Sequence, residues 1–324
     1  MPSLTGLRFP YSRVLLPRTR LAYVHLRNLL TDAKRDRAAR ISGYVAVSMP
    51  EELVILYLLR GEVASATVRD GRGSRALAIA NALEKVPPEP EYGEVCFHEA
   101  DEEQLACMYA THAVSSEPWP AGLTAHDPAA LFPYLMATTF DGVIEIVANE
   151  NVNYLVFRNG SVARAFLASA HHGTVIDRVA KLFAREGRVG DLRVARWGVP
   201  VPLPVQASPA LVQAYRDLAS TLVRRLVDHG RDSAPAIAEH ARQTLAAAHA
   251  ALDGFSFCGK PVKDPLTDTV ALTADVAAWI REVMWTALDH DIVAPEALLK
   301  ELTWERRHMF QSAGLFDEIP WKVM

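Results

Sequence analysis

The stretch "DGVIEIVANENVNYLVFRNGSVARAFL", residues 141–167, indicates the fold of this chain. Its two apolar runs are rich in β-branched and aromatic residues, which favour strands. The second run ends near Asn159 and Gly160, a pair that accepts the positive φ of a short hairpin turn. The stretch therefore predicts three consecutive strands joined by polar turns.

A second copy of this pattern occurs earlier in the chain, as "SGYVAVSMPEELVILYLLRGEVASATV", residues 42–68. Gly142 lies 99 positions after Gly43, and Gly160 lies 99 positions after Gly61. The apolar positions between these glycines correspond under the same offset. An internal repeat is stronger evidence for a fold than any single motif. We therefore predict that the chain forms the same hairpin twice.

The flanks of the two hairpins are also similar. Apolar residues at helical spacing precede and follow each hairpin, and a short strand closes each unit. Ser74 and Thr174 occupy positions that can cap the helix after each hairpin, and Gly73 and Gly173 make the preceding turns. Each unit therefore reads α-β-β-β-α-β, a small sheet that buries one face against its helices.

Two proline-rich stretches mark the boundaries of these units, "SSEPWPAG" at residues 115–122 and "WGVPVPLPVQ" at residues 197–206. The pattern after them is helical, with about four amphipathic segments. The predicted fold class is α+β, with two tandem small α/β-hairpin units followed by an all-α helical bundle. The predicted domains are residues 1–115, which include a basic insertion, 122–198 and 208–324.

Composition limits the class of protein. The 324 residues carry a formal net charge of −4 and a pI near 6.3, which argues against nucleic acid as the main partner. Three cysteines make no secreted disulfide framework. No apolar run approaches the roughly 20 residues that cross a bilayer. We expect a cytoplasmic protein without a membrane span, and the sequence is compatible with a homo-oligomer.

The hairpin pattern resembles the PATAN domain of bacterial PatA-like response regulators. That pattern is a helix, a strand that opens on glycine, a strand that runs into "(F)xxG", and a small-residue strand that ends in alanine. The matching positions are Gly142, Phe157, Gly160 and Ala165 in one copy, and Gly43, Leu58, Gly61 and Ala66 in the other. The resemblance covers roughly residues 20–198. The first copy departs from the pattern through its basic insertion and at Leu58, where the pattern has an aromatic residue.

This resemblance implies a bacterial regulatory or adaptor module that acts through protein contacts, with no family catalytic residues and no cofactor. We therefore expect a non-enzymatic protein that binds protein partners. An enzyme with its site between the repeats and the bundle has the least support. The sequence contains no Walker A, G-x-S-x-G, H-E-x-x-H or dinucleotide fingerprint.

Two arginine-rich stretches favour an alternative function, the sensing of a small anionic ligand such as a cyclic dinucleotide. The candidate residues are Arg35, Arg37 and Arg40 in "KRDRAAR", and Arg72 and Arg75 in "VRDGRGSR". The predicted helix start after the second stretch would add backbone N–H groups that bind anions. A solvated loop and a capped turn are simpler interpretations of the same residues.

Four aromatic residues near the end of the chain are candidate partner contacts. They are Trp304, Phe310, Phe316 and Trp321. Such side chains dock either onto the protein's own helices or onto a partner, and the sequence leaves both readings open.

A group of cysteines and histidines has the composition of a zinc site. Cys96, His98, Cys107 and His112 lie within 17 residues. Their spacing matches no recognised finger, so buried thiols and surface imidazoles explain them better. We therefore predict no metal site.

Overall fold

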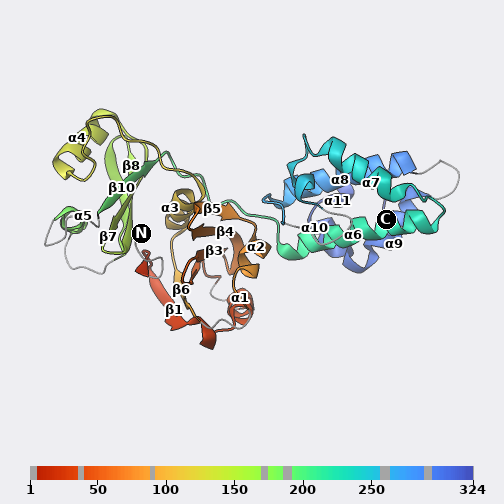
Figure 1. Ribbon diagram of the computed structural model, residues 1–324, viewed down its shortest axis with the longest axis horizontal. Coiled ribbons are helices and arrows are strands. Elements are labelled where there is room, and N and C mark those ends of the chain that lie inside the picture. The colour runs from red at the N-terminus through yellow and green to blue at the C-terminus, as the bar shows by residue number, and fades with distance from the viewer. Residues whose placement is uncertain are drawn as a thin grey trace. The chain divides into compact units, whose positions relative to one another are not determined.

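The computed structural model describes residues 6–35, 40–87, 92–168, 174–184, 192–255, 263–287 and 294–323. The chain is a mixed α/β protein with two antiparallel sheets. It divides into two compact units (Figure 1). The first unit is Met1–Leu77 with Ala82–Pro204, and the second is Ala78–Asn81 with Val205–Met324. Both sheets belong to the first unit.

The larger sheet has six strands in the order β1-β6-β2-β3-β4-β5, and all neighbours are antiparallel. The strands are β1 (Arg13–Arg20), β2 (Gly43–Ser48), β3 (Leu53–Leu59), β4 (Glu62–Asp70), β5 (Gly73–Leu77) and β6 (Glu94–Glu99). A 3₁₀ turn (Leu21–Tyr23) and the helices α1 (Leu26–Arg35) and α2 (Ile79–Glu84) accompany this sheet.

The smaller sheet has four antiparallel strands in the order β10-β7-β8-β9. They are β7 (Gly142–Ala148), β8 (Asn151–Arg158), β9 (Ser161–Phe166) and β10 (Arg193–Trp197). Helix α3 (Glu102–Ala113) lies between the two sheets in the sequence, and α4 (Pro128–Ala137) and α5 (Val175–Phe183) flank the hairpins of the smaller sheet.

The predicted strands form in both hairpins, and their registers correspond at the offset of 99. Gly43 is paired with Leu58, and Gly142 is paired with Phe157. A register shift follows Tyr57 in the one sheet and Val156 in the other. The turn pairs Arg60-Gly61 and Asn159-Gly160 all have positive φ, between 49° and 84°.

Gly43 and Gly142 meet the same steric requirement in their sheets. A Cβ atom on Gly43 would lie 2.1 Å from the His98 carbonyl oxygen, and one on Gly142 would lie 2.2 Å from the Trp197 carbonyl oxygen. The neighbouring strand therefore approaches the backbone so closely that only glycine fits. This explains why the strand that opens each hairpin begins with glycine.

The segment after the first hairpin differs from our prediction. We expected Ser74 to cap a helix, but residues 73–77 form strand β5 and the helix begins only at Ile79. The Asp70 carboxylate accepts a hydrogen bond from the Arg72 amide and two from the Arg75 guanidinium, which closes a β4–β5 turn. These bonds, the Arg75 pair first, lower the pKa of Asp70 to about 2. In the second copy, Thr174 does cap α5, in a capping box with Asp177. Gly173 lies outside the described residues.

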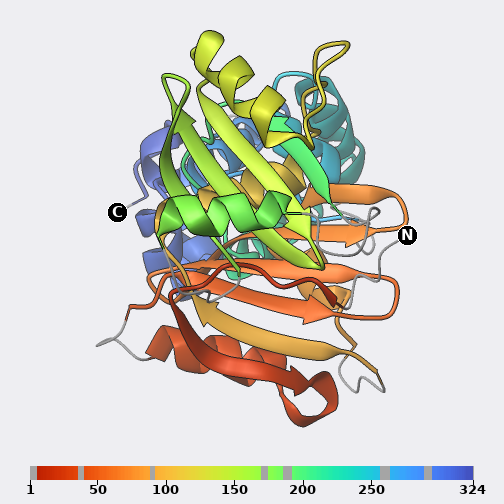
Figure 2. The same ribbon diagram turned by 90° about the vertical axis from the view of Figure 1, so that its left-hand side faces the viewer.

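The sheets of the first unit pack in layers. Alternate residues of β2 join a core with α1 and α2 on one face, and alternate residues of β7 join a core with α4 and α5. The other faces of both sheets share one core with α3 and the segment that contains Leu7 and Phe9. Figure 2 shows α5 lying across the strands of the smaller sheet.

The described part of the second unit is helical. Its helices are α6 (Pro209–Asp228), α7 (Ala234–Leu245), α8 (Thr269–Ala287), α9 (Pro295–Thr303), α10 (Arg307–Ser312) and α11 (Leu315–Glu318). They enclose one core, in which the buried Trp279 indole donates a hydrogen bond to the Ala238 carbonyl and Tyr215 contacts Thr273. Among the described residues, no helix combines the length and the apolar character that crossing a membrane requires.

Candidate functional site

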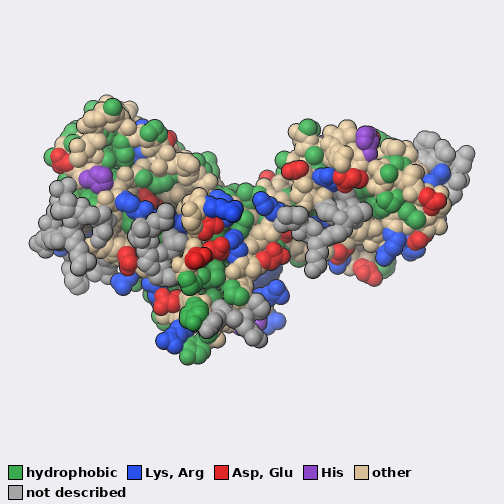
Figure 3. Space-filling model, in the orientation of Figure 1, with side chains coloured by type: hydrophobic (Ala, Val, Ile, Leu, Met, Phe, Trp, Pro, Cys, Tyr) green, Lys and Arg blue, Asp and Glu red, His purple; other side chains and the backbone are tan. Residues whose placement is uncertain are grey.

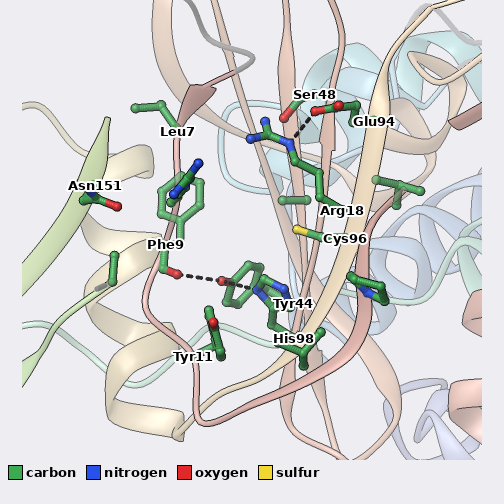
Figure 4. Close-up of a pocket in the computed structure, with 16 residues that line it drawn as sticks. Leu7, Phe9, Tyr11, Arg18, Tyr44, Ser48, Glu94, Cys96, His98 and Asn151 are labelled. Carbon is green, nitrogen blue, oxygen red and sulfur yellow. Dashed lines mark hydrogen bonds and ion pairs between the residues drawn. The ribbon is translucent and has the colours of Figure 1, made fainter. Parts of the chain in front are cut away.

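A cavity of about 620 Å³ lies on the shared-core side of the larger sheet (Figure 4). Its floor consists of three cross-strand pairs of β2 and β6, because side chains two residues apart point to the same face of a strand. These pairs are Tyr44 with His98, Ala46 with Cys96, and Ser48 with Glu94. The side chains of the central pair, Ala46 and Cys96, are small, so the cavity stays open between the pairs at its two ends.

The N-terminal segment forms a wall of this cavity and connects it to the smaller sheet. The Arg8 amide donates to the Glu150 carbonyl at 2.9 Å, and the Val152 amide donates to the Arg8 carbonyl at 2.8 Å. Leu7, Phe9 and Tyr11 line the cavity from this segment. The segment thus holds both sheets together across one side of the cavity.

Hydrogen bonding at the aromatic end of the cavity favours one tautomer of His98. The Tyr44 hydroxyl lies 3.2 Å and 3.1 Å from the carbonyl oxygens of Phe9 and Pro10, and 2.9 Å from His98 Nδ1. The single Tyr44 proton has two carbonyl oxygens within reach, which can only accept; this favours donation by Tyr44 to a carbonyl and by His98 Nδ1 to the Tyr44 oxygen. Burial lowers the pKa of His98, so the neutral ring carries its proton on Nδ1 and Nε2 is an acceptor.

Aromatic rings surround this imidazole. The rings of Tyr11 and His98 are 4.5 Å apart between centroids, and the Tyr44 ring stands edge-on to His98 at 5.4 Å. Phe9 in turn stands edge-on to Tyr44 at 6.0 Å. These rings offer edges and faces for a flat aromatic group.

The other end of the cavity is charged. Arg18, on β1, pairs with Glu94, and Ser48 lies beside this pair in Figure 4. Cys96 lies between the charged and the aromatic ends, and burial raises the pKa of its thiol. Cys96 is therefore a protonated, weakly polar group rather than a thiolate nucleophile.

A second candidate site is the edge of the smaller sheet. Strand β9 ends the strand order, so one of its edges has no neighbouring strand among the described residues. Beside it lies a groove of about 800 Å³ between α4 and α5. Val162, Val175 and Ile176 line this groove and are 40%, 50% and 80% exposed.

Ion pairs connect strand β9 to helix α3. The Arg164 guanidinium pairs with Asp101 at 3.3 Å and Glu103 at 2.9 Å, and it lies 4.8 Å from the ring centroid of Phe166. These contacts tie β9 to the start of α3.

The two sheets differ at this edge. In the larger sheet, β4 occupies the place that β9 has in the smaller sheet, and β5 covers its outer edge from Ala66 to Asp70. In the smaller sheet, the next described element after β9 is helix α5. Within the described parts of the chain, an edge strand is thus present in one sheet and none is present at the corresponding edge of the other.

Of the predicted anion-binding arginines that the structure describes, Arg35 and Arg75 are not brought together. Lys34, which precedes Arg35 at the end of α1, pairs with Glu62 at the start of β4. Arg75 pairs with Asp70 at the end of the same strand. Eight steps of about 3.3 Å place the two ends of β4 about 26 Å apart.

Two other arginines of the predicted anion site, Arg40 and Arg72, lie in separate exposed segments. Arg72 lies in the exposed turn between β4 and β5, and Arg40 is exposed before β2 with a φ of 32°. Arg37 lies outside the described residues. No helix starts at the turn after "VRDGRGSR", so the predicted helix-start amides are not there. On the face drawn in Figure 3, acidic and basic side chains are interspersed.

The four C-terminal aromatic residues have different environments. Phe310 is 2% exposed and lies in the core of the second unit, so of the two readings it docks onto the protein's own helices. Phe316 and Trp321 are partly buried against the same core. Trp304 is 67% exposed and remains available to a partner.

The cysteine and histidine group is dispersed. Cys96 and His98 line the cavity, whereas Cys107 and His112 are buried on α3. His112 is 2% exposed, so its prediction as a surface imidazole is wrong. Among the described residues, no group of three His, Cys, Asp or Glu side chains could hold a metal ion.

Sequence reasoning missed most of the cavity. The alternation of Tyr44, Ala46 and Ser48 gives one wall, but β2 and β6 are separated by three strands and a helix in the sequence. Their adjacency is a property of the strand order. Strand β1, which supplies Arg18, was also not predicted.

Comparisons with known proteins add no identification. No family model matches the chain, and neither a curated protein nor a solved structure matches it significantly.

Proposed function

We propose that the chain is a non-enzymatic, cytoplasmic regulatory or adaptor protein of bacteria, built from two tandem PATAN-like units and a helical C-terminal domain. The open β9 edge beside an apolar groove carries this proposal. It binds protein partners by accepting an extended segment of the partner at that edge.

The chemistry of an open sheet edge supports this binding mode. Unpaired N–H and C=O groups along β9 offer main-chain hydrogen bonds to an added strand. Alternate side chains of such a strand point to the same face, where Val162 and Ile176 provide an apolar surface. Main-chain bonds would supply affinity and the groove would supply selectivity.

Strand β5 provides an internal example of the complex. It pairs antiparallel with β4 from Ala66↔Leu77 to Asp70↔Gly73. The correspondence of the two hairpins at the offset of 99 relates β4 to β9. A partner strand at β9 would take the place that β5 takes in the larger sheet.

The shared registers, register shifts and turn glycines of the two hairpins support a duplication. A duplicated pair of sheets preserves a shape that recognises another protein more readily than it preserves one catalytic arrangement. The alternative, a sensor of a small anion held between the two arginine-rich stretches, gains no support from the placement of Lys34 and Arg75 at opposite ends of β4.

A site-specific crosslinking experiment tests this function. A photoreactive residue at position 162, in the full-length chain expressed in a bacterium, should crosslink partners whose contact site is an extended peptide. The variants Val162→Asp and Ile176→Asp should lose the partner, because each places a carboxylate in the apolar groove. Val201→Asp is the matched control, since Val201 is 67% exposed and lies outside the groove. Partner retention by both groove variants at the control level would refute the proposal.

A further inference from the structure

The cavity beneath the N-terminal segment is separate from the β9 edge and independent of the adaptor function. It is large enough for a small ligand, since ligand sites occupy about 300–1,000 Å³. Both its ends are chemically specific, and the middle is lined by the small side chains of Ala46 and Cys96. We infer that this cavity binds an elongated small molecule with a flat aromatic ring at one end and a single anionic group at the other.

The aromatic end selects the ring. Tyr11, Tyr44 and His98 form a cluster with ring centroids 4.5 Å and 5.4 Å apart around His98. The His98 Nε2 atom is an acceptor, because the hydrogen bond to Tyr44 holds the proton on Nδ1. A ring that carries an N–H or O–H donor therefore matches this end better than a plain hydrocarbon ring.

The charge of the lining selects the other group. Among the described residues that line the cavity, the charged side chains are Arg8, Arg18 and Glu94; Arg18 is paired with Glu94, so the positive charge in excess is that of Arg8 on the N-terminal segment. A monoanion neutralises this excess, whereas a cation would be repelled. Glu94 and His98 are four residues apart on β6, so their Cα atoms lie about 13 Å apart at 3.3 Å per residue. The ligand is accordingly longer than a single ring.

Calorimetric titration with three related probes tests this inference on the full-length protein. The probes are indole-3-butyrate, its neutral amide, and 1-methylindole-3-butyrate, which lacks the ring N–H donor. Indole-3-butyrate should bind with a Kd below about 1 mM. The methylated probe should bind about 3- to 10-fold more weakly, the size of one lost hydrogen bond, and the amide about 10-fold more weakly.

Variants locate the binding to the cavity. Cys96→Phe should abolish binding by filling the middle of the cavity, and Val14→Trp should weaken it from the exposed strand β1, where an added ring strains the fold less. His98→Phe should keep the ring but remove the acceptor, so indole-3-butyrate and its methylated form should then bind equally. Arg8→Gln should weaken the acid more than the amide, whereas Arg13→Gln, an exposed arginine of β1 outside the cavity, should change neither.

Three outcomes would overturn the inference. The first is no binding of indole-3-butyrate up to about 1 mM, the weakest Kd that it allows. The second is equal affinity for all three probes. The third is unchanged affinity in folded Cys96→Phe and Val14→Trp proteins, with folding checked by circular dichroism.

Discussion

Lowering the pH should destabilise the first unit through His112 on α3. The imidazole is 2% exposed, and its Nδ1 donates to the Met108 carbonyl at 2.8 Å. Its Nε2 has no hydrogen-bond partner among the described residues. Burial, together with the positive charge of Arg69, lowers the pKa of His112 from 6.5 to about 4, although the Met108 bond opposes this shift.

The sign and size of the effect follow from proton linkage. As the pH falls, His112 binds a proton in the unfolded chain, near pH 6.5, before it does so in the folded protein, near pH 4. The contribution of the neutral His112 to folding stability is therefore complete above about pH 6.5 and is lost as the pH falls towards 4. Lowering the pKa of His112 from 6.5 to about 4 corresponds to about 3 kcal/mol of unfolding free energy, of which about 2 kcal/mol is lost between about pH 7 and pH 4.5. The His112→Phe variant keeps a flat ring next to Phe9 and has no proton to bind.

Urea unfolding followed by hydrogen exchange of peptides from β3 and β8 reports the first unit separately from the second. Between about pH 7 and pH 4.5, the wild type should lose about 2 kcal/mol more stability than His112→Phe. The exposed His126 provides the control, because His126→Phe should keep the wild-type pH dependence. Equal pH dependence of wild type and His112→Phe, or an NMR titration of His112 near pH 6.5, would refute the reasoning.

Three further substitutions test the packing of the two units. Gly43→Ala should lower the free energy of unfolding by about 1–3 kcal/mol in thermal unfolding, because the new Cβ atom meets the His98 carbonyl oxygen. Gly71→Ala should be tolerated, because a Cβ atom there meets nothing within 4 Å. Equal effects of the two substitutions would contradict the steric argument. Asp264→Asn should lower the free energy of unfolding of the second unit by about 3 kcal/mol, because the buried Arg216 charge would lose its partner. Asp217→Asn, the control, should have little effect, because its pair with Arg306 is exposed. Similar losses for both variants in urea unfolding would contradict the role of burial in the Arg216–Asp264 pair. Thr174→Ala should lower the free energy of unfolding by about 1 kcal/mol, because it removes the cap of α5. The backbone amides of α5 should then exchange hydrogen faster. Unchanged protection of these amides from exchange would count against the capping box.

The strands of the two hairpins could be predicted because their signals are local. Alternating β-branched residues and the turn at Asn159-Gly160 specify strand and turn without reference to the rest of the chain. Strand β1 could not be recognised in this way. It contains Pro17 and several arginines, which suit an exposed edge strand, and it forms because β6 pairs with it.

The misassigned helix at Ser74 has a similar cause. A serine before an apolar run matches a helix start, but the paired Asp70 and Arg75 side chains favour the turn that brings β5 onto β4. The same dependence on distant partners hid the cavity, where Tyr44 and His98 meet only through the strand order. Phe310 shows that an aromatic residue close to the end of a sequence can lie in the centre of a core.

The bridging N-terminal segment has a consequence for synthesis on the ribosome. Arg8 is made more than 140 residues before its hydrogen-bond partners, Glu150 and Val152. At about 5–20 residues per second, the segment must wait roughly 7–30 s before it can dock. During this interval the apolar faces of the larger sheet lack one of their covers, so the nascent chain should depend on chaperones until the smaller sheet emerges.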